Sequence, residues 1–159
     1  MIEELNLVNS DLILNSTRIL ILISEFDSKK SFKMNLNKIM LYDFYMKFPR
    51  TMLPDGENQG EQRDFNEFYS FFHWQPDREE YNLYLRYLLS KKLIHRIIID
   101  NDFCFKINER GREALEKLKS TYAAELDSIA KYIKKEVSKL SDTKVESIII
   151  EKIGMVNYE

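Results

Sequence analysis

The chain has little of several things that mark specialised classes of protein. Its 159 residues include one cysteine, four glycines and three prolines, so it is neither a disulfide-stapled nor a low-complexity chain. Its formal net charge of -2 gives no general attraction to nucleic acid or anionic lipid. No apolar run approaches the roughly 20 residues that span a bilayer, and the acidic start Met1–Glu4 lacks a signal-peptide pattern. These absences predict a cytoplasmic protein without membrane contact.

Residue patterns typical of catalysis are also missing. His73 and His95 have no Cys, Asp or Glu at metal-ligand spacing. Cys104 lies in an apolar strand pattern without an evident base, which favours a small core residue over a nucleophile. The four glycines form no phosphate-binding loop. We therefore expect no enzymatic activity, no metal and no cofactor.

What the chain does have is material for one globular domain. Hydrophobic residues make up 44% and charged residues 31% of the sequence, a balance typical of a folded soluble protein. At 159 residues a single core needs no staples. The sequence predicts a mainly α domain over residues 1–159 with one small β-hairpin.

Residues 77–118 read as helix, strand, tight turn, strand, helix. Apolar residues recur at helical spacing up to Leu89. The run 93–99 then reaches Asp100-Asn101-Asp102, which suits a hairpin reversal. Phe103, Phe105 and Ile107 alternate with Cys104 and Lys106, as in a half-buried strand, and Asn108 can cap the next helix. These parts predict a winged-helix-like domain with its wing at about 93–108.

Two further helices are expected before this stretch. Leu5 to Leu14 shows no clear period and predicts an irregular or short helical arm. Asn15 or Ser16 then caps a helix that reaches Phe26. Asn35 caps a second helix that ends at Pro49. Their apolar faces predict core packing, worth roughly 1.5–3 kcal/mol for each buried side chain.

Residues 50–76 differ in character from the rest. The acidic, glycine-containing loop at 55–62 holds turn residues and little to bury. An aromatic cluster follows, which includes Phe71, Phe72 and Trp74. The cluster either pins this segment to the core or anchors a partner, since exposed aromatic residues dominate interface energetics.

A long helix is expected at the C-terminal end. Apolar residues from Leu115 to Leu140 are separated by steps of three and four, which predicts an extended helix over about 109–140, roughly 48 Å long at about 1.5 Å per residue. A final short helix follows at about 142–153. The long helix packs either on that final helix or on another chain. In the second case Tyr122, Ile129 and Ile133 would contact the partner.

Basic residues gather around the predicted wing and the adjoining helix ends. They fit a DNA-contacting surface in a winged helix, although cations at a helix end are also favoured by the helix dipole. The two alternatives are contact with phosphates and an ordinary solvated face. The six candidate DNA-binding residues are Lys91, Lys92, Arg96, Lys106, Arg110 and Arg112.

Two resemblances extend this interpretation. Leu88-Leu89, Leu93-Ile94 and Glu109-Arg110-Gly111-Arg112 resemble the winged-helix proteins of the transcription-regulator type. Leu41-Tyr42-Asp43-Phe44, with the helix start at Gly111-Arg112 and the stretch 120–130, is similar to the middle component of ABC-three-component systems, the small accessory subunit of Lamassu-type antiphage operons. The resemblance covers most of the chain, but the insert at 55–60 departs from it.

The second resemblance implies an adaptor. Such a subunit would bind an SMC-like ATPase and a separate nuclease effector, and would contact double-stranded DNA through the complex. It carries over no catalytic residue. The alternative is a free winged-helix transcriptional regulator that dimerises through its C-terminal helix and reads DNA with residues 77–92. Glu79 and Glu80 near the start of that helix suit a DNA groove poorly.

Overall fold

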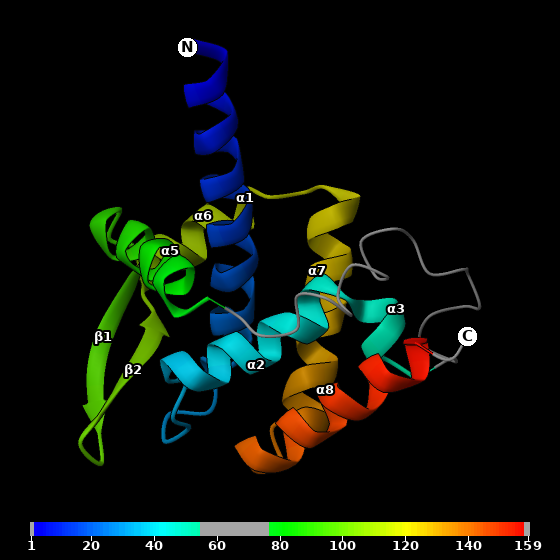
Figure 1. Ribbon diagram of the computed structural model, residues 1–159. Coiled ribbons are helices and arrows are strands. Elements are labelled where there is room, and N and C mark those ends of the chain that lie inside the picture. Colours follow the sequence, from blue (N-terminus) through cyan, green and yellow to red (C-terminus); the bar gives the residue numbers. More distant parts are fainter. Residues whose placement is uncertain (1, 55–76, 158–159) are drawn as a thin grey trace.

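The computed structural model describes residues 2–54 and 77–157, with side chains for 11–54 and 77–154 (Figure 1). The acidic loop at 55–62 and the aromatic residues Phe71, Phe72 and Trp74 lie outside the described residues. As predicted, the described part is mainly helical with one small hairpin. Its elements are α1 (Ile2–Glu25), α2 (Leu36–Lys47), α3 (Pro49–Met52), α5 (Arg78–Ser90), β1 (Ile94–Ile99), β2 (Asp102–Ile107), α6 (Glu109–Glu116), α7 (Thr121–Tyr132), the π-helix η2 (Ile133–Val137) and α8 (Asp142–Asn157).

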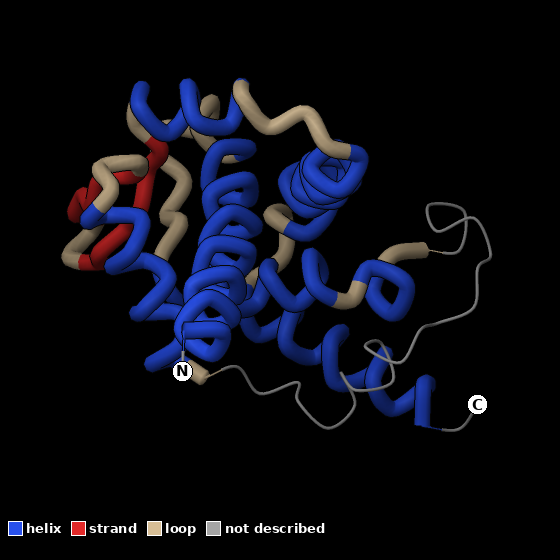
Figure 2. Tube along the Cα trace, turned by 90° about the horizontal axis from the view of Figure 1, so that it is seen from above, coloured by secondary structure: helices blue, strands red, loops and turns tan. Residues whose placement is uncertain are grey.

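Helix α1 passes through the middle of the molecule, with the hairpin at one edge and α7 and α8 toward the other (Figures 1 and 2). Five successive residues, Ile19 to Ile23, are buried. Residues Ile39 to Met46 of α2 are buried as well. A helix that is covered on all sides needs no polar face. Both helices therefore carry apolar residues around most of their circumference rather than along one stripe.

The start of α1 corrects the sequence prediction. The helix begins at Ile2 rather than at a cap formed by Asn15 or Ser16. The Asn15 Nδ2 atom donates to the Asp11 carbonyl oxygen at 2.8 Å inside the helix, and Ser16 is buried. The first turns extend beyond the body of the molecule (Figure 1). The segment expected to be an irregular or short helical arm is therefore part of one continuous helix.

The hairpin forms where the sequence predicts it. Ile94 pairs with Ile107 and Ile99 with Asp102 in an antiparallel register. Asp100 and Asn101 take φ values of 50° and 66°, as both central residues of a two-residue type I′ turn must. The Met34 carbonyl accepts the Phe105 N–H at 2.9 Å, and Asn35 forms a bridge with Cys104. This bridge places the segment before α2 beside the second strand of the hairpin.

One detail of the second strand differs from the prediction. Cys104 is buried, as expected of a core filler, but Phe103 is 54% exposed. The segment around Met34 and Asn35 covers Cys104. Phe103 lies near the hairpin tip, beside the Arg96 guanidinium at 4.6 Å from its ring centre. Strict alternation fails because the core covers only the base of the hairpin.

The predicted continuous helix over about 109–140 is wrong. Helix α6 ends at Glu116 and α7 begins at Thr121. The Ser120 Oγ atom accepts the Ala123 N–H at 3.0 Å, which caps α7 as a separate helix. The final helix starts at Asp142, as predicted, and continues to Asn157. Its Val145, Ile149 and Ile153 are buried within the chain, against α2 and α3.

A buried ion pair joins the three helices around the core. Asp43 of α2 accepts from Arg18 Nε and Nη2 of α1 at 2.7 and 2.8 Å, and from the Tyr81 hydroxyl of α5 at 2.6 Å. All three residues are at most 5% exposed. Burial acts to lower the pKa of Arg18, but the Asp43 carboxylate outweighs it, and the pKa is raised. Burial, with Asp43 nearby, raises the pKa of Tyr81 well above its ordinary value. Arg18 therefore stays charged and Tyr81 stays protonated.

Candidate partner-binding and nucleic-acid surfaces

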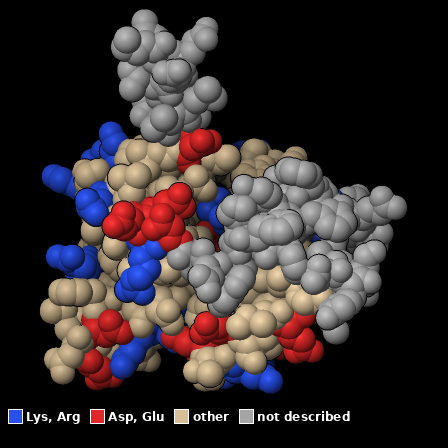
Figure 3. All heavy atoms as spheres, viewed as in Figure 1, with Lys and Arg blue, Asp and Glu red and all other residues tan. Residues whose placement is uncertain are grey.

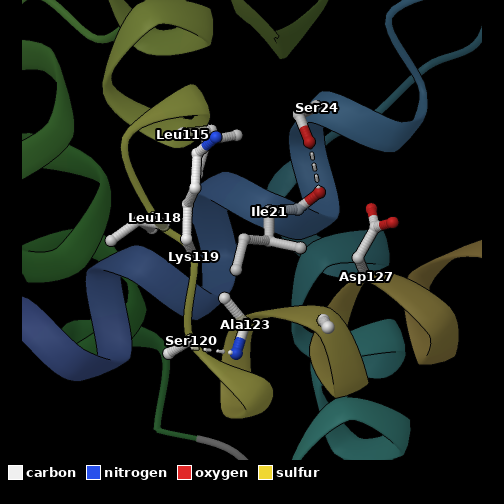
Figure 4. A pocket seen from close by; sticks show the side chains of 9 residues that line it. Ile21, Ser24, Leu115, Leu118, Lys119, Ser120, Ala123 and Asp127 are labelled. Carbon is white, nitrogen blue, oxygen red and sulfur yellow. Dashed lines mark hydrogen bonds between the residues drawn. The ribbon is translucent and has the colours of Figure 1, made fainter.

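A cavity of about 350 Å³ lies between α1 and the segment that joins α6 to α7 (Figure 4). It is open to the surface between α1, the segment after α6 and the first turns of α7. Its lining residues are Ile21, Ser24, Leu115, Leu118, Lys119, Ser120, Ala123, Ala124 and Asp127. Because apolar and polar residues both line it, the cavity is suited to an apolar side chain of a partner whose neighbouring polar groups contact the rim.

Local hydrogen bonds hold the wall in shape. Ser24 Oγ donates to the Ile21 carbonyl at 2.6 Å, so its hydroxyl is satisfied within α1. Ser120 Oγ is occupied as the cap of α7. Asp127 on the rim accepts from Lys131 Nζ at 2.7 Å. The serine hydroxyls are thus already engaged, which leaves Lys119 and Asp127 as the charged groups of the rim.

The three described interface candidates differ in their accessibility. Tyr122 lies in the sequence between Ser120 and Ala123, which line the cavity, and it is 48% exposed. Ile129 is half-buried against the core. Ile133 is 0% exposed, so the prediction that it contacts a partner is wrong for the folded chain: it packs inside. Leu118 is 42% exposed and was not predicted, because the expected long helix placed it on a buried stripe. Ser120, a good helix cap directly after it, was the available signal.

The six basic candidates do not form a single surface. In the hairpin register, Arg96 pairs with Phe105, and Lys106 pairs with His95. Cross-strand partners share a face and neighbours along a strand alternate, so Arg96 and Lys106 lie on opposite faces. Lys106 Nζ donates to the Lys29 carbonyl at 3.0 Å, and Arg112 pairs with Asp27 at 2.9 Å. Lys106 and Arg112 therefore already have partners within the same chain.

The remaining four candidates lie on exposed positions. Lys91, Lys92, Arg96 and Arg110 are exposed. Lys91 Nζ lies 5.8 Å from the ring centre of Tyr87. In Figure 3 basic side chains follow the edge that the hairpin and α5 form, and acidic side chains gather nearer the centre of the same view. Positive charge on this face is therefore a narrow strip.

Lys92 has an unusual backbone conformation. Its φ is 61°, in the left-handed region that favours glycine. The Lys92 N–H donates to the Leu89 carbonyl and the Leu93 N–H to the Leu88 carbonyl, each at 3.0 Å. This is the Schellman end of a helix, where the left-handed position is usually glycine. A lysine there costs about 1 kcal/mol relative to glycine.

Comparison with known proteins assigns the chain to a family. A family model described as "ABC-three component (ABC-3C) system Middle Component 2" matches residues 8–159. The chain belongs to this family. It is therefore a component of an ABC-three-component defence system, as its resemblance predicted at that level. Searches of curated proteins and of solved structures gave no match.

The motif on which the resemblance to the Middle Component 2 family was based lies in the buried part of α2. In Leu41-Tyr42-Asp43-Phe44 the acid is the acceptor of the buried ion pair, and the other three side chains are buried. The motif therefore belongs to a helix that is covered on all faces. Its one charged residue, Asp43, pairs with Arg18. Among the described helices, none has the length and apolar content needed to cross a membrane.

Proposed function

We propose that the chain is a non-catalytic accessory subunit that links an SMC-like ATPase to a nuclease effector in a Lamassu-type system directed against phages or plasmids. The observation that carries this proposal is the family match over residues 8–159. A middle component of a multi-subunit system acts on its neighbours by binding them, which needs exposed surface more than a reaction site. The fold supplies such surface at several points.

The cavity beside α7 is the partner-binding surface that we favour. Leu118 and Tyr122 leave about half of each side chain in water next to a cavity lined by Ile21 and Leu115. Exposed aromatic and aliphatic groups beside a pocket are typical of the energetic centre of an interface. A helix of a partner subunit could place an apolar side chain in the cavity and pair polar groups with Lys119 and Asp127.

Replacing Leu118 and Tyr122 together by aspartate should release a partner without unfolding the chain. Both side chains are exposed, so the free energy of unfolding should change by less than about 0.5 kcal/mol for each. Retention of the neighbouring gene products on the tagged chain should fall at least about tenfold, because an aspartate carboxylate would be buried without a partner. Co-purification with quantitative mass spectrometry measures this.

The matched control is Leu83→Asp with Ile150→Asp. These residues are 51% and 50% exposed and lie on α5 and α8, away from the cavity lining. The control should retain both neighbouring products. Equal retention by the two double variants would count against the cavity as the binding surface, and retention of neither product by the unaltered chain would count against the accessory role itself.

We also propose that the wing contacts DNA within the complex, with Lys92 as a phosphate contact. A lysine in a position that favours glycine is a local cost of the kind found at functional sites. Lys92→Gly should therefore raise the free energy of unfolding by about 1 kcal/mol. The same change should weaken duplex binding by the complex and lower its log-log salt slope by about 0.9.

Asn101→Gly provides the control for the backbone effect. Asn101 also has a left-handed φ, of 66°, but carries no charge, so glycine there should leave DNA binding unaltered. Denaturant unfolding and fluorescence anisotropy with a labelled duplex separate the two effects. If Lys92→Gly stabilises the chain while binding and salt slope stay unchanged, the lysine is no phosphate contact.

The free-regulator alternative loses its main support in this fold. Its dimer depended on one helix of roughly 48 Å, whereas α6 and α7 are separate helices. The outward residues of α5 include Glu79, Leu83 and Arg86, which is a mixed surface for a DNA groove. We therefore place the accessory role first.

A further inference from the structure

Two reciprocal lysine–serine hydrogen bonds join the loop after α1 to η2 and the residue that follows it. Lys29 Nζ donates to Ser138 Oγ at 3.1 Å, and Lys134 Nζ donates to Ser28 Oγ at 2.8 Å. Lys29 also lies 5.9 Å from the ring centre of Phe26. The loop is therefore held by side chains from both segments, although they are more than one hundred residues apart in the sequence.

The π-helix η2 makes this joint possible. The Ser138 N–H donates to the Ile133 carbonyl, five residues back, at 2.8 Å. In an α-helix it would donate to the Lys134 carbonyl instead. The Lys134 oxygen is thereby freed, and it accepts from Ser138 Oγ and from Lys29 Nζ, the latter at 3.5 Å. Such wide turns within helices are frequently found at functional sites.

Around the joint lies a group of ammonium groups, which we call the lysine surface. Lys131, Lys135 and Lys139 are exposed, and they lie in the last turn of α7, in η2 and in the turn that follows η2. The members of the lysine surface are Lys30, Lys131, Lys134, Lys135 and Lys139. Glu25, Asp127 and Glu136 are the nearby acids, and Asp127 is paired with Lys131 at 2.7 Å. Five lysines beside three acids give the surface a net positive charge.

The distribution of charge along the chain agrees with this. Residues 55–76 contain five acidic residues and one basic residue, a formal charge of -4. The whole chain has a formal charge of -2, so the rest of it carries +2. The part of the chain outside residues 55–76 therefore carries a small positive charge, and a total charge near zero does not argue against a local polyanion site.

We propose that the lysine surface binds the phosphate backbone of double-stranded DNA without reading its sequence. Duplex DNA carries one negative charge per about 1.7 Å of its axis, so several exposed lysines on adjoining segments can each reach a phosphate. Lysine is a flexible point charge rather than a bidentate base reader, and the serines that could position a phosphate are engaged in the joint. The surface does not include Lys92, so it stands whether or not the wing contacts DNA.

The test is a charge reversal of two exposed lysines, Lys135→Glu with Lys139→Glu, in the full 159-residue chain. The control is Lys117→Glu with Lys152→Glu, which changes the net charge equally, at the C-cap of α6 and within α8. Fluorescence anisotropy with a labelled duplex of about 30 base pairs, over a series of salt concentrations, measures both. The reversed surface should lose about tenfold or more in affinity at low salt, and its log-log salt slope should fall by about 1.8, or about 0.9 for each phosphate contact.

Each other outcome overturns the proposal. Equal losses in the test and control variants would mean that only net charge matters. Unchanged binding by Lys135→Glu with Lys139→Glu, beside weakened binding by Lys92→Gly, would place DNA on the wing alone. Loss of a co-purified subunit with duplex binding intact would assign the surface to an acidic protein partner. Thermal unfolding of both variants, expected within a few degrees of the unaltered chain, verifies that the fold is retained.

Discussion

Asp43→Asn should lower the free energy of unfolding by about 3–5 kcal/mol. Asparagine keeps the size of the side chain but removes the charge that Arg18 meets at 2.7 Å. The guanidinium remains charged at any accessible pH, and it is 5% exposed. An uncompensated charge would then lie between α1 and α2. Denaturant unfolding followed by circular dichroism gives the change, and the slope against denaturant should remain constant.

Asp27→Asn is the matched control for Asp43→Asn. Asp27 also pairs with an arginine, Arg112, at 2.9 Å, but their side chains are 42% and 47% exposed. Its loss should be below about 1 kcal/mol. A triple replacement, Arg18→Met with Asp43→Leu and Tyr81→Phe, should be closer to the unaltered chain than Asp43→Asn, because no buried charge is left alone. Similar small losses at Asp43 and Asp27 would contradict the burial of this pair.

The sequence contained the signal for the ion pair, but periodicity does not detect it. Arg18 is one charge in the apolar part of α1, and Asp43 is one charge in a buried stretch of α2. A single charge inside an apolar helix implies an opposite partner. Nothing in the sequence, however, says that residues 25 positions apart meet. Tyr81 joins them from a third helix, and only the packing of α1, α2 and α5 decides that.

The elements predicted well are those whose signals are local. Asn35 and Asn108 each accept the N–H three residues on, as helix caps do. The turn at Asp100 and Asn101 follows from two residues that tolerate left-handed backbone. The break before α7 was missed because the apolar spacing continues across it and Ser120 fits both a helix surface and a cap. The cavity was missed with it, since the break creates the cavity.

Gly111→Ala is the second substitution for which we expect a large loss, about 3 kcal/mol or more. A Cβ atom at this position would lie 2.2 Å from the Leu93 carbonyl oxygen and 2.7 Å from Ile107 Cγ1. The backbone oxygen cannot easily retreat, because it accepts the Asn108 N–H at 3.2 Å. Helix α6 must therefore move away from the base of the hairpin, and forced movement in a packed region typically costs about 1–3 kcal/mol, occasionally more.

Gly154→Ala separates this steric effect from the general effect of replacing glycine in a helix. A Cβ atom at Gly154 would meet nothing within 4 Å, so alanine there should raise the free energy of unfolding by about 0.5–1 kcal/mol. Gly111 lies in another helix from Asp43 and shares none of its hydrogen-bond partners. The losses at the two sites should then add within about 0.5 kcal/mol. Opposite signs at Gly111 and Gly154 would show that the glycine of Glu109-Arg110-Gly111-Arg112 is needed for the close approach of α6 to the hairpin. Equal gains at both would disprove that approach.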